Sequence, residues 1–318
     1  MALTMTYTPQ RPSRSESLAL RHLKVHVTRW GAQTSDAPPL VLVHGWMDVG
    51  ASYQFVVDAF SQAFAARRMI IAPDWRGFGS TALPTPCDHY ALADYLGDLD
   101  ALLEHYAPDA RQVDLVGHSM GGNIAMQYAG VRPARIRRLV NLEGFSMPAT
   151  RPSQAPHRLA QWLDELKELR QGTIAMKPYA SLDEVATRLM KNNRRLSPAK
   201  AAWLASQWAR PTADGRWQVM GDAAHKVVNP HLFRVEEMLA LYAAITAPVL
   251  AVEASDDSLA KWSKDPKWSD SPFTLAEYHA RLKHVPDCRI AVVQDAGHML
   301  HHDQPQAVAG LIEGFLSE

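Results

Sequence analysis

The sequence has little cysteine, and it has no excess of charge of either sign. Cys87 and Cys288 are its two cysteines, and neither lies in a C-x-x-C or similar motif. This pattern excludes a disulfide framework and favours a reducing compartment. The 33 Lys and Arg residues balance 33 Asp and Glu residues. Without net charge there is no overall field to attract nucleic acid or acidic lipid, so we expect no nucleic-acid partner.

Long apolar runs and cofactor motifs are also missing. No run reaches the length of about 18 apolar residues that a membrane span requires, and the N-terminal segment lacks the apolar stretch of a signal peptide. These absences predict a cytoplasmic protein that does not associate with membranes. The glycines near residue 119 do not form G-x-G-x-x-G, and no Walker lysine motif occurs. We therefore expect no nucleotide or other cofactor.

The sequence does contain short apolar runs, and these alternate with segments of helical periodicity. The runs fall at residues 39–43, 69–72, 113–116, 136–142, 248–252 and 289–293. Such alternation predicts an α/β fold with a mostly parallel central sheet flanked by helices on both faces. Residues 18–30 alternate with a period of two, which predicts an antiparallel strand or hairpin at the sheet edge.

The alternation stops between residues 145 and 246. Helical periodicity continues there in three segments, at residues 157–170, 182–192 and 198–208. Because ~100 residues are too many for a structureless loop, we predict a helical lid inserted before the last two strands. The expected domains are a flexible N-terminal arm, a core in two pieces and the lid: residues 1–16, 17–144 with 247–318, and 145–246.

Ser119 stands at the turn between a predicted strand and a predicted helix. Gly117 and Gly121 flank it, at positions where a side chain would clash if the turn were sharp. A serine in this G-x-S-x-G pattern takes a strained backbone conformation that projects its hydroxyl outward. The pattern is short, and an ordinary glycine-rich turn is the alternative. The motifs elsewhere in the chain distinguish between these two interpretations.

A base and an acid for Ser119 follow later strands. A serine hydroxyl is a poor nucleophile unless a base removes its proton. His298 follows the last predicted strand, and Asp256 and Asp257 follow the strand before it. Because the carboxyl ends of parallel strands share one edge of a sheet, these side chains can converge on Ser119. The sequence therefore predicts a catalytic serine, acid and histidine in that chain order.

These motifs, in this order, resemble those of the α/β-hydrolase-fold serine hydrolases over residues 18–316. The matching segments are His44-Gly45-Trp46 (oxyanion loop), Asp74-x-Arg76-Gly77-x-Gly79 (the loop after the next strand), GHSMGG from Gly117 (the nucleophile turn) and Gly297-His298. The longer string HGWMDVGASY is similar to the serine hydrolase-like branch of the family.

The resemblance implies roles for particular residues. It implies an oxyanion hole made by the backbone N–H groups of Trp46 and Met120. It places the triad acid on Asp257. Glu143 is the first alternative, because some relatives draw their acid from the end of that strand, and Asp256 is the second.

The expected activity is hydrolysis of a carboxylic ester, or a related acyl bond, through an acyl-enzyme on Ser119. A carbon–carbon bond hydrolase or a cofactor-free perhydrolase on the same triad stays open. So does a non-catalytic ligand-binding module on a hydrolase fold, because fold does not fix function. Epoxide hydrolases and haloalkane dehalogenases need a carboxylate nucleophile, which Ser119 does not supply.

The expected substrate is a small, largely apolar ester, since the lid is rich in aromatic residues. The side chains that we expect nearest to it are Trp46, His118, Phe145, Trp217 and Met299. The sequence leaves open the natural substrate, the oligomeric state and the role of the loop that contains Trp262 and Trp268.

No metal is expected. His298, His301, His302 and Asp303 have the composition of a metal site. However, His298 is the predicted base, and the other three begin the following helix.

Overall fold

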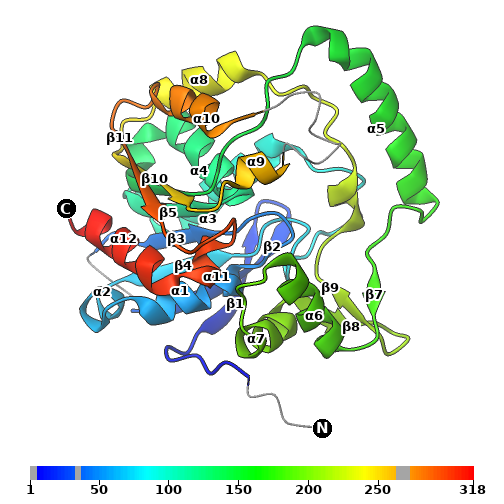
Figure 1. Ribbon diagram of the computed structural model, residues 1–318, viewed down its shortest axis with the longest axis horizontal. Coiled ribbons are helices and arrows are strands. Elements are labelled where there is room, and N and C mark those ends of the chain that lie inside the picture. Colours follow the sequence, from blue (N-terminus) through cyan, green and yellow to red (C-terminus); the bar gives the residue numbers. More distant parts are fainter. Residues whose placement is uncertain (1–5, 33–36, 263–272) are drawn as a thin grey trace.

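An eight-stranded sheet forms the centre of the molecule (Figure 1). The computed structural model describes residues 6–32, 37–262 and 273–318. The strand order is β1-β2-β4-β3-β5-β6-β10-β11, and every pair from β4 to β11 is parallel. The strands are β1 (Arg14–Leu20), β2 (Leu23–Gly31), β3 (Leu40–Val43), β4 (Met69–Pro73), β5 (Val113–His118), β6 (Ile136–Leu142), β10 (Val249–Ala254) and β11 (Cys288–Val293). The predicted mostly parallel sheet is confirmed, with an antiparallel β1–β2 hairpin at its edge.

Helices cover both faces of this sheet. Helices α3, α4, α8 and α10 lie on one face, and α1, α2 and α12 lie on the other (Figure 1). Their apolar side chains pack against the sheet in two separate clusters. Because both faces are covered, β3 is apolar throughout and fully buried. The elements outside the lid are η1 (Gly50–Tyr53), α1 (Gln54–Ala59), α2 (Gln62–Ala66), α3 (Leu92–Tyr106), α4 (Met120–Val131), η2 (Pro133–Arg135), α8 (Val235–Ala243), α9 (Ser258–Trp262), α10 (Leu275–Leu282), α11 (Leu300–Asp303) and α12 (Pro305–Ser317). No helix in the described ranges is long and apolar enough to cross a membrane.

The inserted segment between β6 and β10 contains the three predicted helices. Ser181 and Ser197 cap two of them, and each side chain accepts a hydrogen bond from a backbone N–H of the first turn. A small sheet in the order β7-β9-β8 is added to the helices. The elements of this segment are η3 (Pro152–Gln154), α5 (Ala155–Arg170), β7 (Pro178–Tyr179), α6 (Leu182–Asn192), α7 (Pro198–Trp208), β8 (Ala209–Pro211), β9 (Trp217–Val219) and η4 (Ala223–Lys226).

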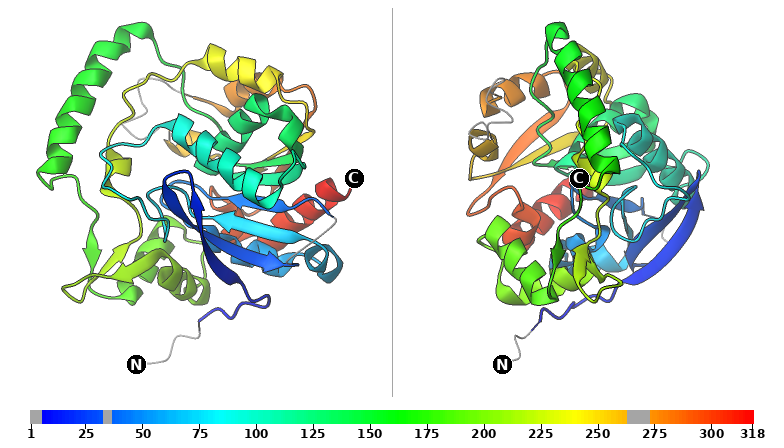
Figure 2. Two further views of the ribbon diagram at one scale, coloured as in Figure 1. Left: turned by 180° about the vertical axis from the view of Figure 1, so that it is seen from behind. Right: turned by 90° about the vertical axis from the view of Figure 1, so that its right-hand side faces the viewer.

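The inserted segment is attached to the rest of the molecule unevenly along its length. Helices α6 and α7 pack with Phe55 of α1 in a third apolar cluster. In contrast, α5 has no buried residue and stands away from the sheet (Figure 2). Although residues 235–243 were expected in the lid, α8 packs against α4 on the face of the sheet. The core therefore resumes before residue 247.

The N-terminal segment differs from the flexible arm that composition suggested. Tyr7 Oη donates a hydrogen bond to Asp58 Oδ2 at 2.6 Å, and the backbone N–H of Arg11 donates to Asp58 Oδ1 at 2.7 Å. Strand β1 already begins at Arg14. Residues 7–16 are thus held against α1 and the sheet by polar contacts. No periodic pattern in the sequence predicts such contacts.

Candidate active site

Ser119 lies on a sharp turn between β5 and α4. Its φ of 52° and ψ of −116° are strained values for a residue with a side chain. A Cβ on Gly117 would lie 2.4 Å from the carbonyl oxygen of Gly121, and one on Gly121 would lie 2.3 Å from that of Val43. Strand and helix therefore approach closely enough here to require both glycines.

His298 faces this serine from the loop after β11. Its Nε2 lies 2.9 Å from Ser119 Oγ. The loop is fixed by His118, whose Nε2 donates to the backbone oxygen of His298 at 2.7 Å. The ring of Trp262 packs edge-on against the imidazole, with centroids 4.7 Å apart. Residues 263–268, the rest of the unassigned loop, lie outside the described residues.

Glu143 is the carboxylate on the other side of His298. Its Oε2 lies 3.3 Å from His298 Nδ1. Glu143 follows β6 with a φ of 55° and is 2% exposed. The same carboxylate accepts hydrogen bonds from the backbone N–H of Ala254 and from Ser258 Oγ, both at 2.7 Å. Three donors thus hold a buried carboxylate in one orientation.

Asp257, expected to contact His298, does not form that contact. Its side chain is exposed and accepts a hydrogen bond from the backbone N–H of Ala260 at 2.8 Å, in the first turn of α9. Asp256 pairs with Arg195 at 2.9 Å and with Lys261 at 2.7 Å, and these hydrogen bonds lower its pKa to about 2. The structure places Glu143, the first alternative, beside His298 instead of the preferred Asp257, which is possible because β6 and β10 are adjacent strands. A carboxylate at the end of either one can reach the same edge.

The loop after β3 lies against the nucleophile turn. A Cβ on Gly45 would lie 3.1 Å from Ser119 Cβ, so the chain passes directly beside the serine. Trp46 follows in this loop, and its side chain is 52% exposed. Met120 is the first residue of α4, where a backbone N–H has no acceptor within the helix. Both expected oxyanion donors therefore belong to segments next to Ser119.

His44 holds this loop in place. Its ring Nε2 accepts a hydrogen bond from the backbone N–H of Trp75, and its carbonyl oxygen accepts one from Trp75 Nε1, both at 2.9 Å. Burial lowers the pKa of His44, which keeps the ring neutral and able to accept. Asp74 adds a second anchor, because its Oδ1 accepts from the backbone N–H of Gly50 at 2.8 Å.

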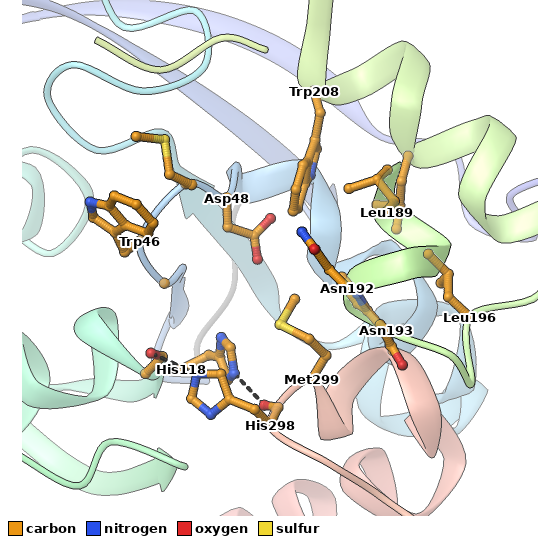
Figure 3. Close-up of a pocket in the computed structure, with 15 residues that line it drawn as sticks. Trp46, Asp48, His118, Leu189, Asn192, Asn193, Leu196, Trp208, His298 and Met299 are labelled. Carbon is orange, nitrogen blue, oxygen red and sulfur yellow. Dashed lines mark hydrogen bonds between the residues drawn. The ribbon is translucent and has the colours of Figure 1, made fainter. Parts of the chain in front are cut away.

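A cavity of about 200 Å³ opens beside Ser119 and His298 (Figure 3). Core loops and lid helices both contribute side chains to it: Trp46, Met47, Asp48, His118, Met299 and His302 from the core, and Leu189, Asn192, Asn193, Leu196, Leu204 and Trp208 from the lid. Trp208 Nε1 also donates to Ser52 Oγ at 2.9 Å, which attaches α7 to the core.

Of the five side chains expected near substrate, three line the cavity and two do not. Trp46, His118 and Met299 are at its wall. Phe145 is buried against Tyr278 and Trp262, and Trp217 packs in the third apolar cluster. The lid residues that do line the cavity were not predicted, because helical periodicity alone does not show which apolar face meets the pocket.

Comparisons with known proteins agree with this architecture. Residues 40–311 match the model of the Alpha/beta hydrolase family. The chain is 25% identical to the cis-3-alkyl-4-alkyloxetan-2-one decarboxylase of Shewanella oneidensis, over 96% of this chain and 89% of the relative. It is 23% identical to the serine hydrolase-like protein of Danio rerio, over 90% of this chain and 83% of the relative.

A solved structure supports the same assignment. A hypothetical protein from Pseudomonas aeruginosa superposes with a TM-score of 0.79 at 25% identity, covering 96% of this chain and 98% of that one. The predicted fold and the resemblance to serine hydrolases are confirmed. Because the family match spans most of its length, the chain belongs to the alpha/beta hydrolase family and is an enzyme of the hydrolase class.

Proposed function

We propose that this hydrolase cleaves a carboxylic ester, or a closely related acyl bond, through an acyl-enzyme on Ser119. The observation that carries the proposal is one continuous set of contacts. Ser119 Oγ is 2.9 Å from His298 Nε2, and His298 Nδ1 is 3.3 Å from Glu143 Oε2. This arrangement has the geometry of a nucleophile, a base and an orienting acid.

Each group has a distinct role in the proposed reaction. His298 accepts the Ser119 proton as the hydroxyl attacks the ester carbonyl, and Glu143 orients and stabilises the imidazolium. The backbone N–H groups of Met120 and Trp46 stabilise the tetrahedral oxyanion. His298 then protonates the leaving alcohol. In the second half of the reaction it activates a water molecule that releases the acid from Ser119.

The pocket favours a small acyl group with apolar character. Leu189, Leu196, Leu204 and Trp208 supply apolar lining, and the cavity volume of about 200 Å³ is below the usual range for drug-sized ligands. The relative from Shewanella oneidensis is named for an oxetan-2-one, which is a cyclic carboxylic ester. β-Lactones therefore belong in the substrate panel beside linear esters.

The test combines active-site labelling with turnover. Wild-type protein, Ser119→Ala and His298→Ala are incubated with a fluorophosphonate probe and with p-nitrophenyl esters and β-lactones. We expect labelling at Ser119, and a loss of kcat on the order of 10⁴-fold or more in both variants. Ser206→Ala, on the exposed face of α7, is the matched serine control and should behave like wild type.

Two results would overturn the proposal. One is wild-type protein that is not labelled at Ser119. The other is ester and lactone turnover by Ser119→Ala at the wild-type rate. A ligand-binding module would bind compounds in the pocket without either labelling or turnover, which distinguishes it from the proposed esterase.

A further inference from the structure

A second cluster of chemically active side chains lies behind the catalytic histidine. Asp48, His118 and His301 each present one ligand-type atom, and these atoms all lie within 4.8 Å of one another. The three residues are 3%, 2% and 0% exposed. They come from the loop after β3, the end of β5 and α11, so the fold brings them together from distant parts of the sequence.

The converging atoms lack hydrogen-bond partners. Asp48 Oδ2, His118 Nδ1 and both ring nitrogens of His301 are buried, with no hydrogen-bond partner among the described residues. Buried polar atoms in folded proteins almost always have a partner, and each exception calls for an explanation such as an ion. Here three residues from three separate segments each contribute at least one such atom to the cluster.

His118 is oriented as a metal ligand would be. Its Nε2 donates to the backbone oxygen of His298, so the lone pair is on Nδ1, the nitrogen in the cluster. Metal-bound histidines commonly donate their other ring N–H to a carbonyl oxygen in this way.

Asp48 supplies a buried negative charge. Its Oδ1 accepts hydrogen bonds from Ser52 Oγ and from the backbone N–H of Val49. Its Oδ2 lies 3.8 Å from His301 Nε2, and no described Lys or Arg forms an ion pair with it. A buried carboxylate normally has a paired cation or coordinates a metal.

We propose that Asp48, His118 and His301 form a binding site for a divalent transition metal of the Zn²⁺ class. One carboxylate and two imidazoles are a ligand set that zinc accepts, with the fourth position taken by water. Ligand atoms about 2 Å from a tetrahedral ion are roughly 3.3 Å from each other, so small side-chain rotations would close this cluster on an ion. Asp48 and His118 also line the cavity, which gives the ion an entry path (Figure 3).

This site differs from the histidine cluster considered in the sequence. That cluster contained His298 and Asp303, whereas the proposed one uses Asp48 and His118, which are remote from it in sequence. The only shared residue of the two sets is His301. The composition near residue 301 could not reveal the site. Its other two ligands, Asp48 and His118, lie in the loop after β3 and at the end of β5.

The experiment uses untagged protein, with Zn²⁺ and Co²⁺ as probes. After dialysis against Zn²⁺ and then metal-free buffer, we expect one Zn²⁺ per chain by mass spectrometry. Co²⁺ should give the intense visible absorption of a four-coordinate ion. Asp48→Asn and His301→Gln should each raise the Kd for Zn²⁺ on the order of 100-fold or more, because each removes a direct ligand.

Two control variants make the result specific. His225→Gln removes a partly buried histidine in η4 outside the cluster and should retain the ion. Ser119→Ala removes the proposed nucleophile and should also retain it, so failure of the metal site and failure of the proposed esterase can be distinguished. Circular dichroism verifies the folding of each variant. If Asp48→Asn does not fold, His301→Gln and the wild-type cobalt spectrum decide.

The proposal is overturned if wild-type protein retains no Zn²⁺ and Co²⁺ shows only the weak spectrum of the hydrated ion. It is equally overturned if a folded Asp48→Asn or His301→Gln variant binds Zn²⁺ as tightly as wild type. That result would mean that the ion binds to other histidines of the chain.

Discussion

Glu143 Oε2 lies 3.3 Å from His298 Nδ1, although 155 residues separate the two in the chain. The carboxylate of this contact follows β6, which is the next strand in the chain after Ser119. Asp257, at the end of the neighbouring β10, instead caps α9. The two carboxylates therefore form a matched pair for testing, since one contacts the histidine and the other does not.

Glu143→Gln should lower kcat for p-nitrophenyl esters on the order of 10³- to 10⁴-fold, because the amide no longer stabilises the imidazolium or fixes its tautomer. Asp257→Asn should stay within a few-fold of wild type. Steady-state kinetics of the three proteins measures this. Loss of activity in Asp257→Asn together with an active Glu143→Gln would show that the acid is Asp257.

Leu189→Ala should shift the preferred acyl chain toward longer esters. Leu189 is 6% exposed in α6 and lines the cavity, so its truncation lengthens the apolar pocket. One methylene in such a pocket changes kcat/KM by about 10- to 200-fold. The measurement is kcat/KM for esters of increasing acyl length. Leu163→Ala, on exposed α5, is the control, and an identical length profile in both variants would contradict the pocket assignment.

Gly121→Ala should destabilise the fold by about 1–3 kcal/mol or more, because its Cβ would meet the carbonyl oxygen of Val43 at 2.3 Å. Gly310→Ala, in α12, meets nothing within 4 Å and should stabilise by roughly 0.5–1 kcal/mol. Urea unfolding of both variants tests the contrast. If the two variants were equally stable, the turn at Ser119 would have room for a Cβ atom at residue 121.

In His225→Gln, the free energy of unfolding should decrease less as the pH falls than it does in wild type. His225 stacks between Phe78 and Tyr90, with ring centroids 3.8 Å from each. Burial lowers its pKa from 6.5 to about 3. At pH values between about 3 and 6.5, His225 is protonated in the unfolded chain and neutral in the folded chain. The stability that this histidine contributes is therefore complete above pH 6.5 and is lost as pH falls toward 3.

Urea unfolding at about pH 7, 6 and 5 measures this effect. The slope of unfolding free energy against pH should decrease in His225→Gln by up to about 1.4 kcal/mol per pH unit. His22→Gln, at an exposed turn, controls for loss of a histidine from the surface. An unchanged slope in His225→Gln would contradict the assignment of a buried neutral ring.

Strong local signals made much of the fold predictable. Helices α6 and α7 have the ranges that periodicity indicated, because their apolar faces repeat at helical spacing and a serine caps the start of each. Ser119 and His298 were predictable for a different reason. Parallel strands place the residues that follow them at one edge of the sheet, whatever their separation in sequence.

Features that depend on packing between elements were not predictable. The choice between Glu143 and Asp257 depends on which of two adjacent strand ends points at His298. The hydrogen bonds from Tyr7 and Arg11 to Asp58 join segments that are far apart in the chain, and no repeating sequence pattern indicates them. The cavity wall formed by Leu189 and Trp208 depends on how the lid helices are rotated over the core.

The hydrogen bond from Trp208 to Ser52 gives the protein a built-in optical reporter. Ser52 Oγ in turn donates to Asp48, so the indole connects the lid to the proposed metal cluster through one hydroxyl. Indole emission responds to the hydrogen bonding and polarity of its surroundings. Fluorescence of Trp208, read as the difference between wild type and Trp208→Phe, can therefore follow ligands entering the cavity without any attached dye.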